Sequence, residues 1–358
     1  TLILVVSACS GDDDPEAAEV TPTTEATTKT TAEPTTDTVG AGCGAATAEP
    51  GTERIEFASG DDTYEVERVV PPTYDGTTPR PLIVDLHGFT STIEQQNLFS
   101  DLPAQAADRG YLVLTPQAES ATLTISGEQI RAPFWNVSQG LSAEVPDALD
   151  DVAFLTQLID TTTSEFCVDD ARIYVTGFSN GAGMAATLAC DLPGRIAAIA
   201  PVSGVNVAAQ CDDLEAVSVI AFHGDADPLV EYGGGSAAGV DIGNPSVEGR
   251  VGEFASAADC DSEPETSSPF DDIELHRWTG CQRGVDVELY TVVGGGHTWP
   301  GMLNYVDSEK LAEITSGDQR LVELADVDLA EVAGHMTVNV EATSTMLDFF
   351  DEHSLATR

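Results

Sequence analysis

The sequence predicts an α/β fold with a mainly parallel sheet flanked by helices. Short apolar segments that end in glycine or proline alternate along the chain with segments of helical periodicity. Parallel strands need a crossover connection, usually a helix, so this alternation is typical of a parallel sheet. With 358 residues, of which 42% are hydrophobic, the chain can bury a substantial core as one large or two ordinary domains.

The expected elements follow one another in a regular order. Continuous apolar segments predict strands buried on both faces; these are residues 80–88, 110–116, 172–177, 196–202, 217–223 and 287–293. Helical spacing or small residues predict helices over residues 150–160, 182–190 and 345–353. Two acidic, weakly apolar stretches, residues 233–275 and 302–334, are expected to be loop insertions near the functional site, either covering its rim or lying on the surface.

The N-terminal region is expected to lie outside the globular part. Residues 2–8 are apolar or small, Cys9 follows them, and the next residues are polar. This pattern resembles the end of a signal peptide with a bacterial lipobox, whose cysteine carries a lipid; the alternative is an ordinary signal peptide. We expect residues 1–9 to be this remnant and residues 10–50, rich in Thr, Glu and Pro, to be a disordered tether. The chain would then be exported, to the cell surface or beyond it.

The formal net charge of −47 results from 61 Asp+Glu and only 14 Lys+Arg residues. It excludes nucleic-acid binding through phosphate contacts and docking on anionic lipid through a basic patch. Only nine of the acidic residues lie in residues 1–50, so the globular part is itself acidic. A lysine-poor acidic surface keeps a protein soluble in high salt, so we expect stability and activity to rise between low and molar salt.

A candidate nucleophile lies in the sequence Gly177-Phe178-Ser179-Asn180-Gly181. It follows an expected strand and precedes an expected helix, which is the context that the G-x-S-x-G nucleophile elbow requires. Such a turn projects the Ser179 hydroxyl above the sheet. The N–H groups of Asn180 and of Phe89, which follows the strand ending at His87-Gly88, are the expected donors of an oxyanion hole. A plain strand-ending turn is the alternative for the segment at Phe89.

A serine nucleophile needs a base and an acid that orients the base, in the chain order Ser, Asp or Glu, His for this arrangement. Asp227 and His297 follow expected strands in glycine-containing turns and match that order. Asp225 is the rival acid. The other histidines are expected to buttress loops (His87 and His223) or to be surface or packing residues (His276, His335 and His353).

These motifs together resemble the polyhydroxybutyrate depolymerase and feruloyl esterase family of secreted α/β-hydrolases. The resemblance covers residues 51–353 and is carried by His87-Gly88-Phe89, Phe134-Trp135-Asn136, residues 151–154, residues 177–184, residues 223–227 and residues 296–301. It implies an α/β-hydrolase catalytic domain over residues 51–358 that hydrolyses short hydroxyalkanoate esters, or feruloyl and acetyl esters of polysaccharide. It also places Trp135 and Trp299 near the site, where they stack on substrate or pack in the core.

The seven cysteines fit an exported protein. If Cys9 carries a lipid, six cysteines remain for disulfides, and they allow fifteen pairings; free buried thiols are the alternative. Our preferred pairing is Cys190–Cys211, Cys260–Cys281 and Cys43–Cys167. The sequence has no Cys-x-x-Cys or His-Glu-x-x-His motif, so we infer no metal site and no cofactor.

The sequence thus favours a serine carboxylic-ester hydrolase that works through an acyl-enzyme on a small ester, a polyester or a polysaccharide ester. It would meet a membrane only through a lipid on Cys9, and it would bind no nucleic acid. Two alternatives stay open. One is a serine peptidase with the same triad, against which there is no second large gating domain. The other is a surface-binding lipoprotein that has a hydrolase fold without activity.

Overall fold

The computed structural model describes residues 41–44, 48–125, 128–137, 150–208, 210–237, 239–306 and 332–355. All of them belong to one compact unit, Thr38–Arg358. The expected signal-peptide remnant, Cys9 and most of the expected tether lie outside the described residues. Within the described residues, no helix is long and apolar enough to cross a membrane.

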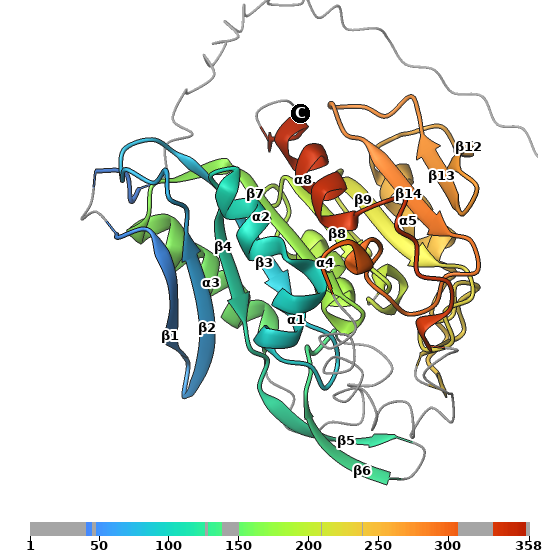
Figure 1. The fold of residues 1–358 in the computed structure, drawn as a ribbon, viewed down its shortest axis with the longest axis horizontal. Coiled ribbons are helices and arrows are strands. Elements are labelled where there is room, and N and C mark those ends of the chain that lie inside the picture. Colours follow the sequence, from blue (N-terminus) through green and yellow to red (C-terminus); the bar gives the residue numbers. More distant parts are fainter. Residues whose placement is uncertain are drawn as a thin grey trace, which may run out of the picture. The chain divides into compact units, whose positions relative to one another are not determined.

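A ten-stranded sheet forms the centre of the fold (Figure 1). Its strands, in spatial order, are β1 (Gly51–Ser59), β2 (Asp62–Val70), β4 (Leu112–Pro116), β3 (Arg80–Leu86), β7 (Val168–Phe178), β8 (Ala198–Val202), β9 (Ser218–Gly224), β14 (Val287–Val292), β13 (Ile273–Trp278) and β12 (Glu265–Phe270). The six strands from β4 to β14 are parallel, and the two at either edge are antiparallel. The six central strands are the six that the sequence predicts.

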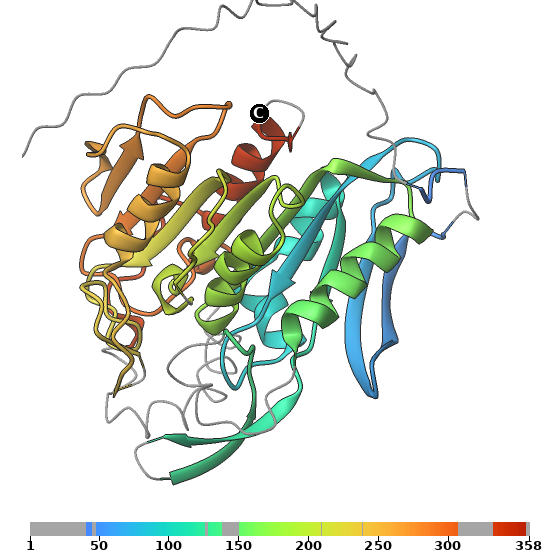
Figure 2. The same cartoon turned by 180° about the vertical axis from the view of Figure 1, so that it is seen from behind.

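Helices cover both faces of the sheet (Figures 1 and 2). One face carries α1 (Ile93–Ser100), α2 (Leu102–Asp108) and α8 (Ala342–Glu352), and the other carries α3 (Asp151–Glu165), α4 (Asn180–Asp191) and α5 (Val247–Ala257). Alternate residues of a strand point to opposite faces. In β3, for example, Leu82 and Val84 pack with the core under α3, α4 and α5, whereas Ile83 packs with the core under α1, α2 and α8. This two-sided burial explains the continuous apolar strands.

The structure contradicts the expectation that all of residues 233–275 form a loop insertion. Only its first part is irregular, with the small hairpin β10 (Ser236–Ala237) and β11 (Val240–Asp241). The rest belongs to the fold, because α5 buries Val247, Val251 and Phe254 in the main core and β12 and β13 extend the sheet. Of the second expected insertion, residues 307–331 lie outside the described residues. The described part before it includes a 3-10 turn, η2 (Met302–Asn304).

Two smaller elements complete the fold. The hairpin of β5 (Ser120–Ile125) and β6 (Glu128–Pro133) forms a separate two-stranded sheet between β4 and α3. A 3-10 turn, η1 (Val205–Val207), follows β8 and packs against α4 and α5.

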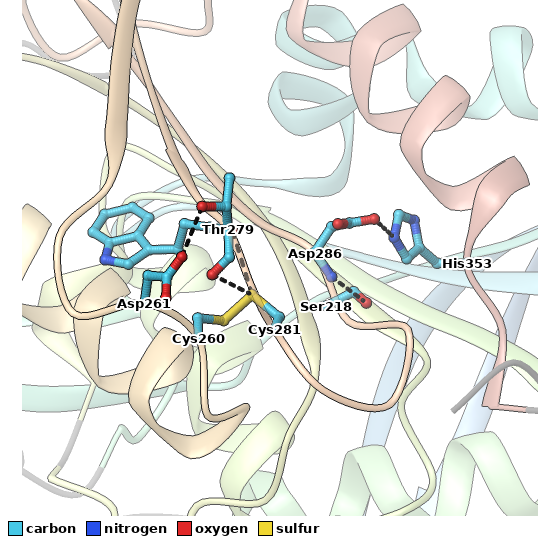
Figure 3. Close-up of a disulfide and its surroundings, with 8 residues drawn as sticks. Ser218, Cys260, Asp261, Thr279, Cys281, Asp286 and His353 are labelled. Carbon is cyan, nitrogen blue, oxygen red and sulfur yellow. Dashed lines mark hydrogen bonds and ion pairs between the residues drawn. A yellow bond between two sulfur atoms is a disulfide. The ribbon is translucent and has the colours of Figure 1, made fainter.

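The three expected disulfides are confirmed. Cys43–Cys167 joins the segment before β1 to the start of β7. Cys190–Cys211 joins the end of α4 to the segment before β9. Cys260–Cys281, shown in Figure 3, joins the turn after α5 to the segment between β13 and β14.

Candidate active site

The candidate site residues all follow parallel strands. Phe89 comes after β3, Ser179 directly after β7, Asp227 after β9 and His297 after β14. Because the carboxyl ends of parallel strands lie at the same edge of a sheet, these four residues belong to loops on one edge. Ligands of open α/β sheets bind at this edge.

Ser179 occupies a strained turn between β7 and α4. Its backbone angles are φ 55° and ψ −116°, a conformation that residues with a side chain rarely adopt. The turn is fixed from below, since Ser179 N–H donates to Val202 O at 2.8 Å. Glycine is required on both sides. A Cβ atom at Gly177 would lie 2.6 Å from the carbonyl carbon of Gly181, and one at Gly181 would lie 2.2 Å from Leu86 O. Gly177 and Gly181 are therefore needed because the end of β7, the start of α4 and the end of β3 are in direct backbone contact at the elbow.

Asp227 and His297 form a hydrogen-bonded pair. Asp227 Oδ2 lies 2.7 Å from His297 Nδ1, and Asp227 Oδ1 accepts the N–H groups of Leu229 at 2.8 Å and Val230 at 2.9 Å. Burial alone would raise the pKa of Asp227. Hydrogen bonds and charge interactions with His297 and His223 instead hold this pKa well below its usual range. Ionised Asp227 can only accept, so His297 donates from Nδ1 and keeps Nε2 free to take a proton.

His297 lies close to the elbow but is not bonded to the serine. Its ring packs on the ring of Phe178, the residue before Ser179, with the centroids 4.7 Å apart. Ser203 Oγ donates to Thr298 O at 3.1 Å and fixes the next residue of the same loop. Among the described residues, the hydroxyl of Ser179 has no hydrogen-bond partner, and its side chain is partly exposed. In hydrolases of this kind, the hydrogen bond between the serine hydroxyl and the histidine commonly forms or tightens only when substrate is bound.

Two backbone N–H groups are available for an oxyanion. No described residue accepts a hydrogen bond from the N–H of Phe89 or of Asn180. The Phe89 loop is held by His87, whose Nε2 accepts Ala118 N–H at 3.0 Å, so that Nδ1 donates to Gly88 O at 2.7 Å. Burial lowers the pKa of His87 to about 4, which keeps the ring in this neutral form. His87 thus buttresses the loop, as the sequence predicts.

Trp135 and Trp299 are packing residues in the structure. Trp135 is 0% exposed and Trp299 is 1% exposed, so neither presents a ring face to a substrate. Trp135 Nε1 donates to His87 O at 2.9 Å, and Trp299 Nε1 donates to Thr343 Oγ1 at 3.0 Å. The expectation that they stack on substrate is therefore corrected in favour of its alternative. Both indoles stabilise the loops that carry the candidate site.

The rival acid and the remaining histidines have other partners. Asp225 Oδ1 accepts Gly294 N–H at 2.6 Å, so Asp225 braces the loop of His297 without reaching its ring. His223 is buried, and its Nε2 lies 2.9 Å from Val230 O. His335 and His353 pair with Asp272 and Asp286, as described below.

Two side chains of the site, those of Asn180 and Asp151, make hydrogen bonds that the sequence analysis does not predict. The side chain of Asn180 accepts Trp135 N–H at 2.6 Å and donates to Trp135 O at 2.9 Å, so it ties the elbow to the segment after β6. Asp151 accepts Asn136 N–H at 2.7 Å, and burial raises the pKa of Asp151 to about 7. The Trp-Asn segment is therefore held by an amide and a carboxyl group far from it in the sequence. Among the described residues, no three His, Cys, Asp or Glu side chains gather as metal ligands.

The fold and the elbow define an α/β-hydrolase, and the comparisons with known proteins agree. Residues 69–241 match the family described as phospholipase/carboxylesterase. Feruloyl esterase B of Piromyces equi is 30% identical over 237 residues, which cover 63% of this chain and 41% of that protein. A putative esterase of Nocardia uniformis subsp. tsuyamanensis is 29% identical over 239 residues, which cover 62% of this chain and 66% of that protein. The chain is thus similar to carboxylesterases and feruloyl esterases, and its sheet and elbow have the arrangement of the α/β-hydrolase fold.

The matches are partial in length. The chain spans less than two thirds of the length of these two relatives. Among solved structures, an acetyl xylan esterase from Aspergillus awamori has a TM-score of 0.48 and 16% identity, over 75% of this chain and 99% of that chain.

Proposed function

We propose that the chain is a carboxylic-ester hydrolase that uses Ser179 as nucleophile and passes through an acyl-enzyme. The observation that carries this proposal is the Asp227–His297 hydrogen bond beside the strained Ser179 turn. Ionised Asp227 fixes the tautomer of His297 that can act as a base. A base oriented in this way is what a serine hydroxyl needs to become a nucleophile.

Acylation begins when Ser179 Oγ attacks the ester carbonyl carbon and His297 Nε2 takes the hydroxyl proton. The charge that develops on the carbonyl oxygen is met by the free N–H groups of Phe89 and Asn180, with the N-terminus of α4 behind them. The protonated His297 is stabilised by the Asp227 carboxylate. When the tetrahedral intermediate collapses, His297 donates its proton to the leaving alcohol and the acyl group stays on Ser179 Oγ.

Deacylation repeats these steps with water as the nucleophile. His297 Nε2 takes a proton from the water molecule, which attacks the acyl carbon, and the same two N–H groups hold the new oxyanion. His297 then returns the proton to Ser179 Oγ, and the carboxylic acid leaves. The ester and one water molecule are the only reactants, and Ser179 and His297 end the cycle in the protonation states in which they began.

For the substrate, we propose a feruloyl or acetyl ester of a polysaccharide, or a short hydroxyalkanoate ester. The relatives named as feruloyl esterase B and as a bifunctional acetylxylan esterase/xylanase support the first class. The formal charge of −47 disfavours strongly anionic polymers. Three disulfides favour export to an oxidising compartment. We also propose that Cys9 carries a lipid that anchors the exported protein to the cell surface. The alternatives to an esterase are a serine peptidase and a non-enzymatic binding protein, and a panel of ester and peptide substrates distinguishes them.

The experiment compares the wild type with Ser179→Ala on a panel of p-nitrophenyl acetate, p-nitrophenyl butyrate, methyl ferulate, hydroxybutyrate oligomers and peptides. We expect ester hydrolysis by the wild type, no hydrolysis above background by the variant, and no peptide cleavage. Equal thermal unfolding of the two proteins controls for folding. Undiminished ester hydrolysis by folded Ser179→Ala would contradict the proposal.

A further inference from the structure

The loop that carries His297, residues 293–297, is hydrogen-bonded to a segment that lies more than 30 residues later in the chain. This segment, Val332–Asn339, is here called the strap. Val332 O accepts His297 N–H at 2.6 Å, and His335 N–H donates to Gly294 O at 2.8 Å. Between these bonds, Gly295 and Gly334 form an antiparallel bridge. The backbone of the candidate base is therefore held by the strap.

The strap and the loop fit together without space for a side chain. A Cβ atom at Gly296 would lie 2.1 Å from Val332 O, and one at Gly334 would lie 2.4 Å from Gly296 N. Gly334 also has a positive φ of 51°, which disfavours a side chain. Because the two backbones are in direct contact, a displacement of the strap displaces His297.

Asp272 fixes the strap from the other side. It lies between β12 and β13, where its Oδ2 lies 2.8 Å from His335 Nε2 and its Oδ1 accepts Asn339 Nδ2 at 2.8 Å. Its backbone carbonyl accepts Val293 N–H at 2.9 Å, at the start of the His297 loop. Asp272 therefore binds both the strap and the loop that the strap holds.

We propose that Asp272 and His335 are positioning residues for His297, acting through the strap; this inference rests on the proposed function. The His335 side chain is 48% exposed and that of Asp272 is 17% exposed. Exposed ion pairs contribute little to global stability. A base that is displaced by about 1 Å can nevertheless lose 100-fold in rate. The pair is therefore expected to influence the rate of reaction more than the stability of the fold.

The chain offers a matched control at the opposite end of β14. His353 Nε2 lies 2.9 Å from Asp286 Oδ2, and Asp286 directly precedes β14 (Figure 3). Both pairs join an imidazole Nε2 to an aspartate Oδ2, although the side chain of His353 is 5% exposed and that of His335 is 48% exposed. The position is different, because His353 ends α8 at the amino end of the strand, away from the loop of His297.

The experiment measures kcat, KM and the rate of fluorophosphonate labelling for the wild type, His335→Ala, His335→Gln and His353→Ala. All rates are divided by the number of sites that fluorophosphonate titrates. We expect His335→Ala to lower kcat and the labelling rate about 10-fold or more with little change in KM, because the base is displaced. His335→Gln keeps a donor at the place of Nε2, so we expect it to stay within about 3-fold of the wild type. His353→Ala should keep the wild-type kcat.

Asp272→Ala completes the test as a double-mutant cycle. If the two residues act as one unit, adding His335→Ala to Asp272→Ala should cost little more than Asp272→Ala alone, which also removes the bond to Asn339. A wild-type kcat in His335→Ala, or a loss that appears only as fewer titratable sites with normal rates, would overturn the inference and leave the proposed function intact. A wild type that neither hydrolyses esters nor is labelled would overturn both.

Discussion

Asp227 divides its two carboxylate oxygens between different partners: Oδ2 lies 2.7 Å from His297 Nδ1, while Oδ1 accepts the backbone N–H groups of Leu229 and Val230. The two N–H groups hold the carboxylate in one orientation about the bond that joins it to Cβ. That orientation leaves a single oxygen facing the imidazole, which fixes both the direction of the ring and the position of its proton.

This arrangement predicts the effect of Asp227→Asn. The carbonyl oxygen of the new amide takes the two backbone N–H groups, so its NH2 group faces His297 Nδ1. His297 must then accept at Nδ1 and carry its proton on Nε2, which cannot act as a base. We expect kcat for p-nitrophenyl acetate to fall about 10⁴-fold with the fold preserved. A loss smaller than about 10-fold would contradict the role given to Asp227.

Asn180 is expected to separate stability from catalysis. Asn180→Ala removes the side chain that bonds Trp135 N–H and O, but it leaves the backbone N–H that we propose as an oxyanion donor. We predict a loss of about 1–3 kcal/mol in the free energy of unfolding, because buried polar groups of Trp135 lose their partners. The rate per titrated site should fall far less than in Ser179→Ala. A fall as large as in Ser179→Ala would show that the side chain itself acts in the reaction.

The disulfides are expected to contribute unequally to stability. Cys43–Cys167 closes a sequence separation of 124 residues, whereas Cys260–Cys281 closes one of 21. In the chain-entropy account, a longer loop restricts the unfolded chain more, so we expect losses of about 4–5 kcal/mol and about 3 kcal/mol on removal. Urea unfolding of Cys43→Ala/Cys167→Ala and Cys260→Ala/Cys281→Ala compares them. A larger loss for the shorter loop would contradict this order.

Asp85 is expected to make stability depend on pH. It is fully buried in β3, with Gln96 Nε2 at 2.6 Å and Ser100 Oγ at 3.2 Å, and burial raises its pKa to about 7. Between pH about 4, where the carboxyl group titrates in the unfolded chain, and pH about 7, Asp85 keeps its proton in the folded state and loses it in the unfolded state. The contribution of Asp85 to stability therefore falls as pH rises from about 4 to about 7 and is constant above.

Urea unfolding of the wild type and of Asp85→Asn at several pH values measures this effect. The difference between their free energies of unfolding removes the titration of other groups, such as Asp151, that both proteins share. We expect the wild type to lose stability relative to the variant over that range. A difference that does not change with pH would contradict the raised pKa.

The sequence predicts the centre of the sheet better than its edges. The six central strands are buried on both faces, and burial on both faces leaves an unbroken apolar segment. The edge strand β12 is exposed along its whole length and pairs in the sheet with β13 alone, so its sequence carries no such pattern. Helix α5 could have been found, because Val247, Val251 and Phe254 have helical spacing and Ser246 caps the helix.

The same limit applies to the site. Ser179, Asp227 and His297 lie in glycine-containing turns at strand ends. An apolar strand followed by such a turn can be recognised from neighbouring residues in the sequence. The contact of the strap with the loop of His297 joins residues more than 30 positions apart. Gly296 and Gly334 leave space for it, but a glycine alone does not indicate which distant backbone it meets. The burial of Trp135 and Trp299 could not be predicted either, because residue type alone does not distinguish a tryptophan that faces substrate from one that packs in the core.

The most direct test of the central claim is to trap the acyl group. The reaction with p-nitrophenyl acetate is quenched in acid within the first turnover, and the digested protein is mapped by mass spectrometry. We predict one acetyl group on the peptide that contains Ser179 in the wild type and none in Ser179→Ala. Continued turnover with no acetyl group on Ser179, or with the acetyl group on another residue, would contradict the account.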